Sequence, residues 1–275
     1  MNVGSVNSAD GTVIGYRWLG SGPAVLLIHG GMQASQHLMK LAVALSADFT
    51  VFVPDRRGRG LSGPHGDYSI TREVEDLQAL IAATGASRVF GLSSGALVTL
   101  RTALAGLEAI ALYEPPLSVN DSVPLAWVPR FDREIARGRI ASALVTSLKG
   151  LKIEPWLGRL PRFVLVPLMA VGSRLQGNGS SDDVPISALV PTFHFDIQLV
   201  QEMADTAQDY SSLGSRVLLL GGAKSPAFLG VTLDELAATI PHAQRITFTG
   251  LGHSGPDDDG DPERVAEALR DFFTT

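Results

Sequence analysis

The sequence predicts an α/β fold, namely a mostly parallel, doubly wound sheet with an inserted helical segment. Near-continuous apolar runs such as residues 24–28 and 50–54 are typical of strands that are covered on both faces. Strand-like runs alternate with helical stretches at both ends of the chain, which favours parallel pairing. Between residues 115 and 210 this alternation gives way to short helical stretches interrupted by prolines. We therefore expect a core of residues 1–114 and 211–275 and a helical cap at 115–210.

Each element follows from its local pattern. Residues 12–19 alternate as a first strand or hairpin partner, and residues 36–45 are expected to form the crossover helix between the two apolar strands. Residues 71–83 begin with threonine and acidic residues and place apolar side chains on one face, as an amphipathic helix does. The same patterns predict strands at 87–90, 109–114, 215–220 and 244–249, and helices at 96–105, 229–240 and 262–273.

Composition limits the classes of partner. The formal net charge is -6 and 18 % of the 275 residues are charged, so no basic stripe is available for nucleic acid. The absence of cysteine excludes disulfides and thiolate metal sites. Residues 1–10 lack the basic start and apolar run of a secretory signal, which favours a cytoplasmic protein. The longest apolar stretch, residues 163–171, is too short to cross a bilayer and contains Pro167, so no membrane partner is expected.

The segment with the clearest chemical meaning is residues 91–95, which read GLSSG. A strand is predicted before this segment and a helix after it. A serine on a tight turn between a strand and a helix exposes its hydroxyl, and flanking glycines let the backbone turn sharply. Ser93 is therefore the predicted nucleophile.

Three further motifs accompany this turn in a fixed order. Residues 29–32 (HGGM) follow the strand at 24–28, residues 55–62 (DRRGRGLS) follow the next strand, and residues 250–253 (GLGH) follow the last strand. With these four landmarks the chain resembles the α/β-hydrolase family over nearly its whole length. The resemblance implies a sheet of that family's type and a cap over the site.

The resemblance also implies roles for individual residues. Ser93 would attack the substrate and His253 would accept its proton, because a serine hydroxyl is a poor nucleophile without an adjacent base. The backbone N–H groups of Ser94 and of Gly31 or Met32 would form the oxyanion hole.

Other residues of these motifs are expected to support the site. His29 would order the loop that carries the oxyanion donors, and Asp55 with its neighbouring arginines would brace the loop that follows its strand. An alternative for Arg56, Arg57 or Arg59 is the binding of an acidic substrate. The remaining histidines have no metal-ligand spacing, so no metal or other cofactor is expected; they are His37, His65, His194 and His242.

The third member of the triad departs from the family pattern. The turn at 221–226 (GGAKSP), where the family usually has its acid, contains no carboxylate. Glu114 is the favoured replacement, because it ends a strand at the same edge of the sheet as Ser93 and some family members place their acid there. The alternatives are Asp234, Glu235, Asp196, Asp205, or a Ser–His pair without an acid. The acidic run at 257–259 is expected to be a solvated loop.

Three function classes remain open. The favoured one is a serine hydrolase that cleaves an ester, lactone or similar bond of a small, fairly apolar substrate. The others are a cofactor-independent lyase, cyclase or dioxygenase that uses the same pair for proton abstraction, and a non-catalytic receptor for a small ligand. Apolar cap residues would line the substrate chamber or pack the cap onto the core; they are Trp127, Trp156, Phe163, Leu165, Leu168 and Met169. The substrate and the oligomeric state stay undetermined.

Overall fold

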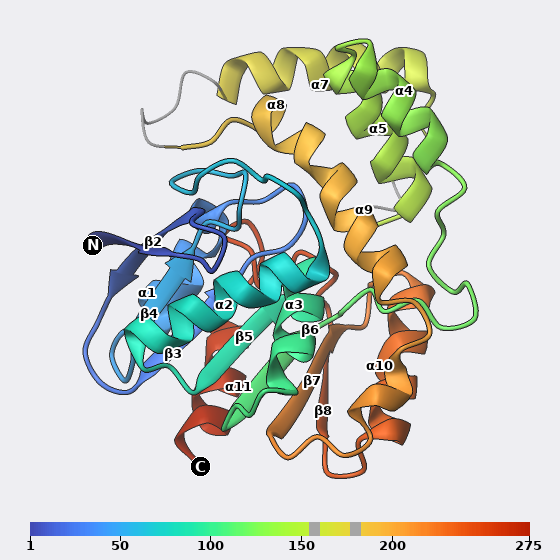
Figure 1. The fold of residues 1–275 in the computed structure, drawn as a ribbon. Coiled ribbons are helices and arrows are strands. Elements are labelled where there is room, and N and C mark those ends of the chain that lie inside the picture. The colour runs from blue at the N-terminus through green and yellow to red at the C-terminus, as the bar shows by residue number, and fades with distance from the viewer. Residues whose placement is uncertain (154–159, 177–182) are drawn as a thin grey trace.

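A computed structural model describes residues 1–153, 160–176 and 183–275 of the chain. In this part of the chain eight strands form one sheet with the order β1-β2-β4-β3-β5-β6-β7-β8 (Figure 1). Strands β1 and β2 pair antiparallel at one edge, β2 pairs antiparallel with β4, and the pairs from β4 to β8 are all parallel. The predicted mostly parallel α/β sheet is confirmed. The strands are β1 (Asn2–Asn7), β2 (Val13–Leu19), β3 (Ala24–Ile28), β4 (Thr50–Pro54), β5 (Arg88–Leu92), β6 (Ala109–Tyr113), β7 (Arg216–Gly222) and β8 (Gln244–Phe248).

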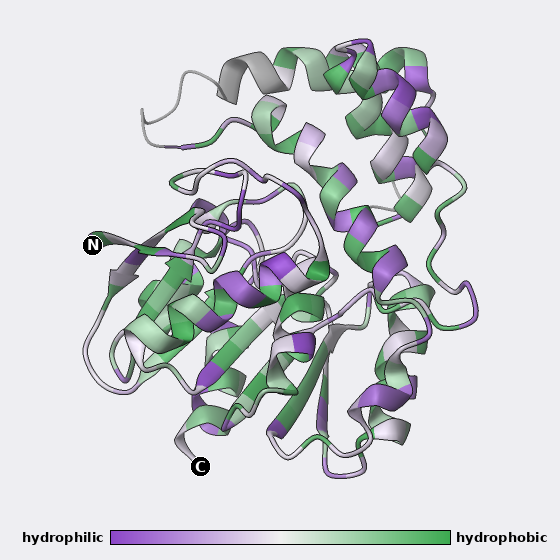
Figure 2. Cartoon of the chain, in the orientation of Figure 1, coloured by the Kyte–Doolittle hydropathy of each residue, from purple (hydrophilic) through white to green (hydrophobic). Residues whose placement is uncertain are grey.

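Helices cover both faces of the sheet. On one face α1 (Met39–Leu45) and α11 (Pro262–Thr274) pack against the strands, and on the other lie α2 (Ile70–Thr84), α3 (Ser94–Ala103) and α10 (Ala227–Thr239). Side chains of β3 alternate between the two resulting apolar cores, as the period of a strand requires. Figure 2 shows apolar residues concentrated on the central strands and polar residues on the outer side of α2.

A helical segment separates β6 from β7 and stands at one end of the sheet (Figure 1). We call it the α4–α9 segment. In the described ranges its helices are α4 (Val128–Ala136), α5 (Ile140–Leu151), α7 (Arg162–Gln176), α8 (Ile186–Leu189) and α9 (Phe193–Glu202). Helix α9 contacts α3, which covers one face of the sheet, and α9 leads the chain from the segment back to the core. Apolar side chains of α4, α5 and α9 form a small cluster of their own around Phe131.

Two elements differ from the sequence expectation. Strand β1 was not predicted, because its side chains are mostly small, polar and exposed, and only its pairing with β2 makes it a strand. The crossover helix begins as a 3-10 turn, Ser35–Leu38, before α1 proper. Two further 3-10 turns, Val190–Thr192 and Ala207–Tyr210, flank α9.

No helix in the described ranges is long and apolar enough to span a membrane. The apolar run at 163–171 lies within α7, which contains Pro167.

Candidate active site

Ser93 lies on a sharp turn between β5 and α3. Its φ of 53° and ψ of -124° are costly for a residue with a side chain, and this geometry persists where the surrounding structure enforces it. The Ser93 N–H donates to the Tyr113 carbonyl oxygen at 2.9 Å, which ties the turn to β6. At Gly95 a Cβ would lie 2.4 Å from the His29 carbonyl oxygen, so only glycine fits where α3 passes the end of β3.

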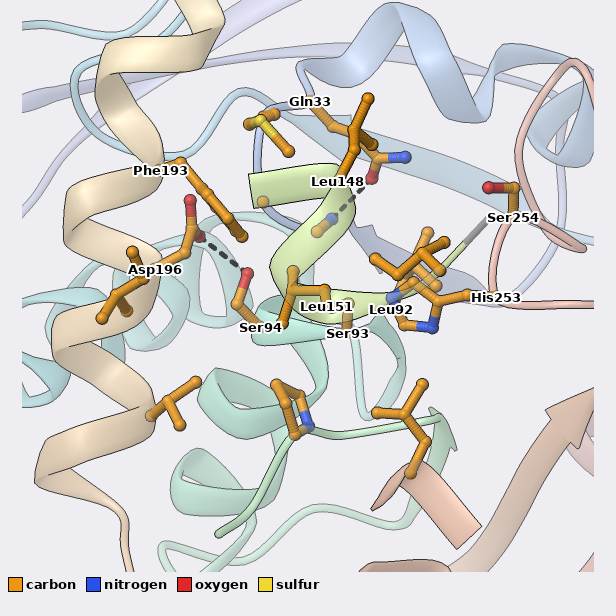
Figure 3. A pocket seen from close by; sticks show the side chains of 18 of the residues that line it. Gln33, Leu92, Ser93, Ser94, Leu148, Leu151, Phe193, Asp196, His253 and Ser254 are labelled. Carbon is orange, nitrogen blue, oxygen red and sulfur yellow. Dashed lines mark hydrogen bonds between the residues drawn. The ribbon is translucent and has the colours of Figure 1, made fainter. Parts of the chain in front are cut away.

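A cavity of about 310 Å³ opens beside this serine (Figure 3). Ser93, Ser94 and His253 line it together with Gly31 and Met32, so the residues singled out in three separate motifs meet at one place. Most of the remaining lining is apolar and comes from the α4–α9 segment; it includes Trp127, Leu144, Leu148, Leu151, Phe193 and Ile197.

Glu114 contacts the ring of His253. The two side chains are joined by a 2.6 Å hydrogen bond between Glu114 Oε2 and His253 Nδ1. When Nδ1 carries the proton and donates it to the carboxylate, Nε2 is left as the basic nitrogen. Glu114 is 1 % exposed, and its other oxygen accepts the Gly222 N–H at 2.7 Å. The carboxylate is therefore held from the β7 side while it orients the imidazole.

Local backbone features place Glu114 there. Glu114 itself has a positive φ of 48°, which turns the chain at the end of β6. At the adjacent end of β7, a Cβ on Gly221 would lie 3.1 Å from Glu114 Oε1 and 2.8 Å from Leu233 Cδ1. Glycine at this position leaves the room that the glutamate occupies. Lys224, at the place of the usual family acid, is exposed.

The alternative acids all have other partners. Asp234 pairs with Arg245, Glu235 accepts from Gln208 Nε2 at 3.4 Å, and Asp205 accepts the Asn120 N–H at 2.7 Å. Asp196 accepts a hydrogen bond from the Ser94 hydroxyl group at 2.7 Å (Figure 3). Among the described residues, the carboxylate that bonds the His253 ring is that of Glu114.

His29 is buried beneath the loop that follows β3. Its Nδ1 lies 2.9 Å from the Gly30 carbonyl oxygen and its Nε2 accepts the Arg56 N–H at 3.1 Å. Nδ1 is therefore the donor and the ring is neutral. Burial lowers the pKa of His29 well below its usual value, and the charges of Arg59 and Arg56 lower that pKa further. The arrangement fixes the loop without requiring a charge.

Asp55 braces the next loop through backbone donors. Its carboxylate accepts the Ser35 N–H at 2.6 Å and the Leu61 N–H at 2.9 Å, and it pairs with Arg17 at 3.3 Å. These bonds connect the loops that follow β3 and β4.

The three arginines of the 55–62 motif point into the protein. Arg57 pairs with Asp76 at 2.6 Å. Arg56 pairs with Glu73 at 2.8 Å and with Asp196 at 2.8 Å. These guanidinium groups are buried and face carboxylates of the chain, so the geometry does not favour the binding of an acidic substrate by them.

Asp196 joins the α4–α9 segment to the core. It accepts from Arg56 and, at 2.7 Å, from Arg59, and it also bonds Ser94, the residue after the nucleophile. Burial works against its charge, but Arg59 and Arg56 hold the pKa of Asp196 below its usual value. Nothing in the sequence indicated this cluster, because Asp196 lies 102 to 140 positions from its partners and meets them only in the fold.

The acidic run at 257–259 is not uniformly solvated, so that expectation is wrong for its first residue. Asp257 lines the cavity and accepts from Gln33 Nε2 at 2.8 Å, and burial raises its pKa to about 7. Asp258 accepts the Lys40 N–H at 2.8 Å, and Asp259 is exposed. The one sequence feature that could have indicated a role for Asp257 is its position four residues after His253. No sequence feature pointed to Gln33.

The expected lining of the chamber is correct only in part. Trp127 lines the cavity, whereas Leu165 and Met169 pack in a separate apolar cluster. Phe163 and Leu168 are 79 % and 54 % exposed, so neither packs against the core. Trp156 lies outside the described residues. Helix α5 supplies lining in their place through Leu144, Leu148 and Leu151.

The remaining histidines make separate local contacts. His37 bonds the Ala34 backbone, His65 packs on Phe195, His194 meets Asp132 and His242 meets the Ser215 carbonyl oxygen. Within the described ranges, no group of three His, Asp or Glu side chains could hold a metal ion.

Comparison with known proteins agrees with this architecture. A model of the alpha/beta hydrolase family matches residues 25–268. A 2-(acetamidomethylene)succinate hydrolase of Mesorhizobium japonicum is 26 % identical over 263 residues, which covers 92 % of this chain and 89 % of the relative. A cis-3-alkyl-4-alkyloxetan-2-one decarboxylase of Shewanella oneidensis is 24 % identical over 284 residues, covering 97 % and 87 %. The crystal structure of an alpha/beta hydrolase from Sphaerobacter thermophilus is 33 % identical, with a TM-score of 0.78 over 98 % of this chain and 100 % of that one.

Proposed function

Because this chain belongs to the alpha/beta hydrolase family and is an enzyme of the hydrolase type, we propose that it is a serine hydrolase with Ser93, His253 and Glu114 as its triad. The observation that carries the proposal is the 2.6 Å hydrogen bond from His253 Nδ1 to Glu114 Oε2 beside the cavity that Ser93 lines. The proposed reaction is cleavage of an ester, lactone or similar acyl bond.

In the proposed mechanism Ser93 Oγ attacks the acyl carbon and its proton passes to His253 Nε2. Glu114 stabilises the imidazolium that forms, without itself taking the proton. His253 then protonates the leaving oxygen, and an acyl-enzyme remains until water, deprotonated by the same imidazole, releases the acid. No hydrogen bond joins Ser93 to His253 in the described part of the chain; such bonds commonly tighten when substrate binds.

Backbone groups would stabilise the tetrahedral oxyanion. The Ser94 N–H opens α3, where no earlier turn of the helix supplies an acceptor, and the helix dipole is positive at this end. Gly31 and Met32 line the same cavity and would supply the second N–H from the loop that His29 orders. We call residues 29–33 the oxyanion loop.

The cavity suggests the kind of substrate. We propose that the α4–α9 segment acts as the cap and residues 1–114 and 211–275 as the catalytic core. The cap helices place apolar side chains around the space beside Ser93, so burial of an apolar acyl or alkyl group would supply much of the binding free energy. A small substrate with an apolar portion fits a volume of about 310 Å³.

A second candidate is a cofactor-independent lyase that uses the same Ser–His pair for proton abstraction. One observation favours it: the relative from Shewanella oneidensis, similar over 97 % of this chain, is a decarboxylase. In that reaction Ser93 would form no acyl-enzyme.

Labelling with a fluorophosphonate separates the candidates, because only an activated serine is phosphonylated quickly. For the hydrolase we expect one adduct in the intact mass, lost in Ser93→Ala, together with turnover of p-nitrophenyl esters. Labelling without turnover of any activated ester would favour the lyase. If wild-type protein gains no adduct and turns over no ester, the proposed hydrolase is wrong.

A further inference from the structure

Asp257 reaches the oxyanion loop through a side chain of that loop. Its Oδ1 accepts from Gln33 Nε2 at 2.8 Å, across 224 positions of sequence. The oxygen atom of the same amide group, Gln33 Oε1, accepts a hydrogen bond from the Gly30 N–H at 2.8 Å (Figure 3). The Gln33 amide therefore connects the His253 loop to the backbone of residues 29–33.

The direction of the Gln33 amide depends on its partner. An ionised carboxylate only accepts hydrogen bonds, so it requires the NH₂ side of the amide and leaves Oε1 for the Gly30 N–H. A protonated carboxyl group can also donate. It then no longer enforces this direction of the amide, and the hydrogen bond that it accepts from Nε2 loses its charge assistance. The Gln33 amide, and with it the bond from the Gly30 N–H, is then held less firmly.

The charged surroundings of Asp257 are mixed. Burial is the main cause that raises its pKa to about 7, while Gln33 and His253 oppose that rise. Asp258 and Asp259 in the same loop add like charge. Other titratable groups near this loop or along the cavity are Glu114, which bonds His253, Lys40 and His37, which face Asp258, Tyr113 on β6, and Asp196 on α9.

We propose that Asp257 is a positioning residue for the serine chemistry: its carboxylate fixes the Gln33 amide and thereby the oxyanion loop, and protonation of Asp257 releases that loop. The inference rests on the proposed function of Ser93. Asp257 acts through Gln33 and touches no reacting atom.

The test is the rate constant of fluorophosphonate labelling between about pH 5.5 and 8.5, which needs no knowledge of the substrate. In wild type we expect two ionisations on the acid side, so that the logarithm of the rate rises with a slope between one and two. Asp257→Asn removes one of them. That variant should show a slope of one and a rate at high pH that is roughly tenfold lower, because a loosened oxyanion donor costs transition-state stabilisation.

A double-mutant cycle with Gln33→Met tests whether Asp257 affects the oxyanion loop through Gln33. If Asp257 acts through Gln33, the rate of Gln33→Met/Asp257→Asn equals that of Gln33→Met within error. Asp259→Asn is the matched control: it removes an exposed carboxylate whose like charge raises the Asp257 pKa, so it should move the profile only to lower pH and keep the wild-type slope. Thermal melting shows that each variant is folded.

Two results would overturn the inference while leaving the hydrolase intact: a wild-type slope in Asp257→Asn, or losses that add in the double variant. A wild-type protein that gains no adduct at pH 8.5 would instead refute the proposed function, and this inference with it.

Discussion

Glu114 and His253 lie 139 positions apart in the sequence, and their side chains meet with 2.6 Å between Oε2 and Nδ1. The contact joins the end of β6 to the loop after β8, which are not neighbouring strands of the sheet. The glutamate crosses the end of β7, where the Gly222 N–H holds its second oxygen. The acid of the proposed triad thus reaches the histidine from one strand further away than a residue in the β7 turn would.

Replacing this acid tests its role. Glu114→Gln should lower kcat for an activated ester by about 10²–10⁴-fold, because the amide no longer stabilises the imidazolium. Far-ultraviolet circular dichroism and the melting temperature should show a folded protein. Asp234→Asn is the matched control: it removes an exposed acid that pairs with Arg245 and should leave kcat within a factor of two. Equal rates for both variants would remove Glu114 from the triad.

A methyl group at residue 221 should displace the same carboxylate. Gly221→Ala places a Cβ 3.1 Å from Glu114 Oε1 and 2.8 Å from Leu233 Cδ1, so we expect roughly a tenfold loss in the rate of Ser93 phosphonylation. Gly230→Ala on α10 is the control, because a Cβ there meets nothing within 4 Å and alanine favours the helix. A Gly221→Ala enzyme with the wild-type rate would show that the position of Glu114 tolerates this crowding.

The Asp196 cluster should contribute to stability. Asp196→Ala leaves the buried guanidinium group of Arg59 without a carboxylate and that of Arg56 with Glu73 alone, which is expected to cost about 3–5 kcal/mol in the free energy of unfolding in urea. Asp209→Ala removes an exposed partner of Arg101 and should cost less than about 1 kcal/mol. Similar midpoints for the two variants would mean that this cluster does not stabilise the contact between α9 and the core.

Burial of Asp257 should make the free energy of unfolding decrease as the pH rises. Its folded-state pKa of about 7 lies above the unfolded value of 3.8, so the folded protein binds the extra proton between these values. Relative to Asp257→Asn, wild-type stability should be constant below about pH 4, fall as the pH rises to 7 and then level off. The total change is at most about 4 kcal/mol. Urea unfolding of both proteins at pH 4, 5.5, 7 and 8 measures it, and a rise with pH would contradict the assignment.

The apolar cavity wall should set the length of acyl chain that is accepted. Leu148→Trp fills space that Leu148 borders, so the ratio of its KM to the wild-type KM should grow with chain length from p-nitrophenyl acetate to hexanoate. Leu168→Trp enlarges an exposed side chain on α7 and should leave this series unchanged. A Leu148→Trp series that runs parallel to wild type would place the acyl group elsewhere.

Much of the fold could be predicted because its strands are buried on both faces. The runs at 24–28 and 50–54 need no partner information to be recognised, since only apolar residues fit there. Strand β1 could not be predicted, because its exposed side chains have no strand signature and its pairing with β2 alone makes it a strand. Hydropathy alone predicts that Phe163 and Leu168 either line the chamber or pack the cap onto the core, and both are exposed, because hydropathy does not tell which face of a helix meets the core.

For the site, the sequence by itself determined the position of the Ser93 turn and the expectation that His253 lies near it. These depend on local backbone requirements, such as the glycine at 95 that lets α3 pass the end of β3. Only the tertiary structure decided what surrounds them: Glu114 against His253, Asp196 between two arginines, and Asp257 on Gln33. These contacts join residues more than 100 positions apart. The strand-end position of Glu114 made it the favoured acid among several candidates, but the geometry and burial of all three contacts arise from packing of the whole chain.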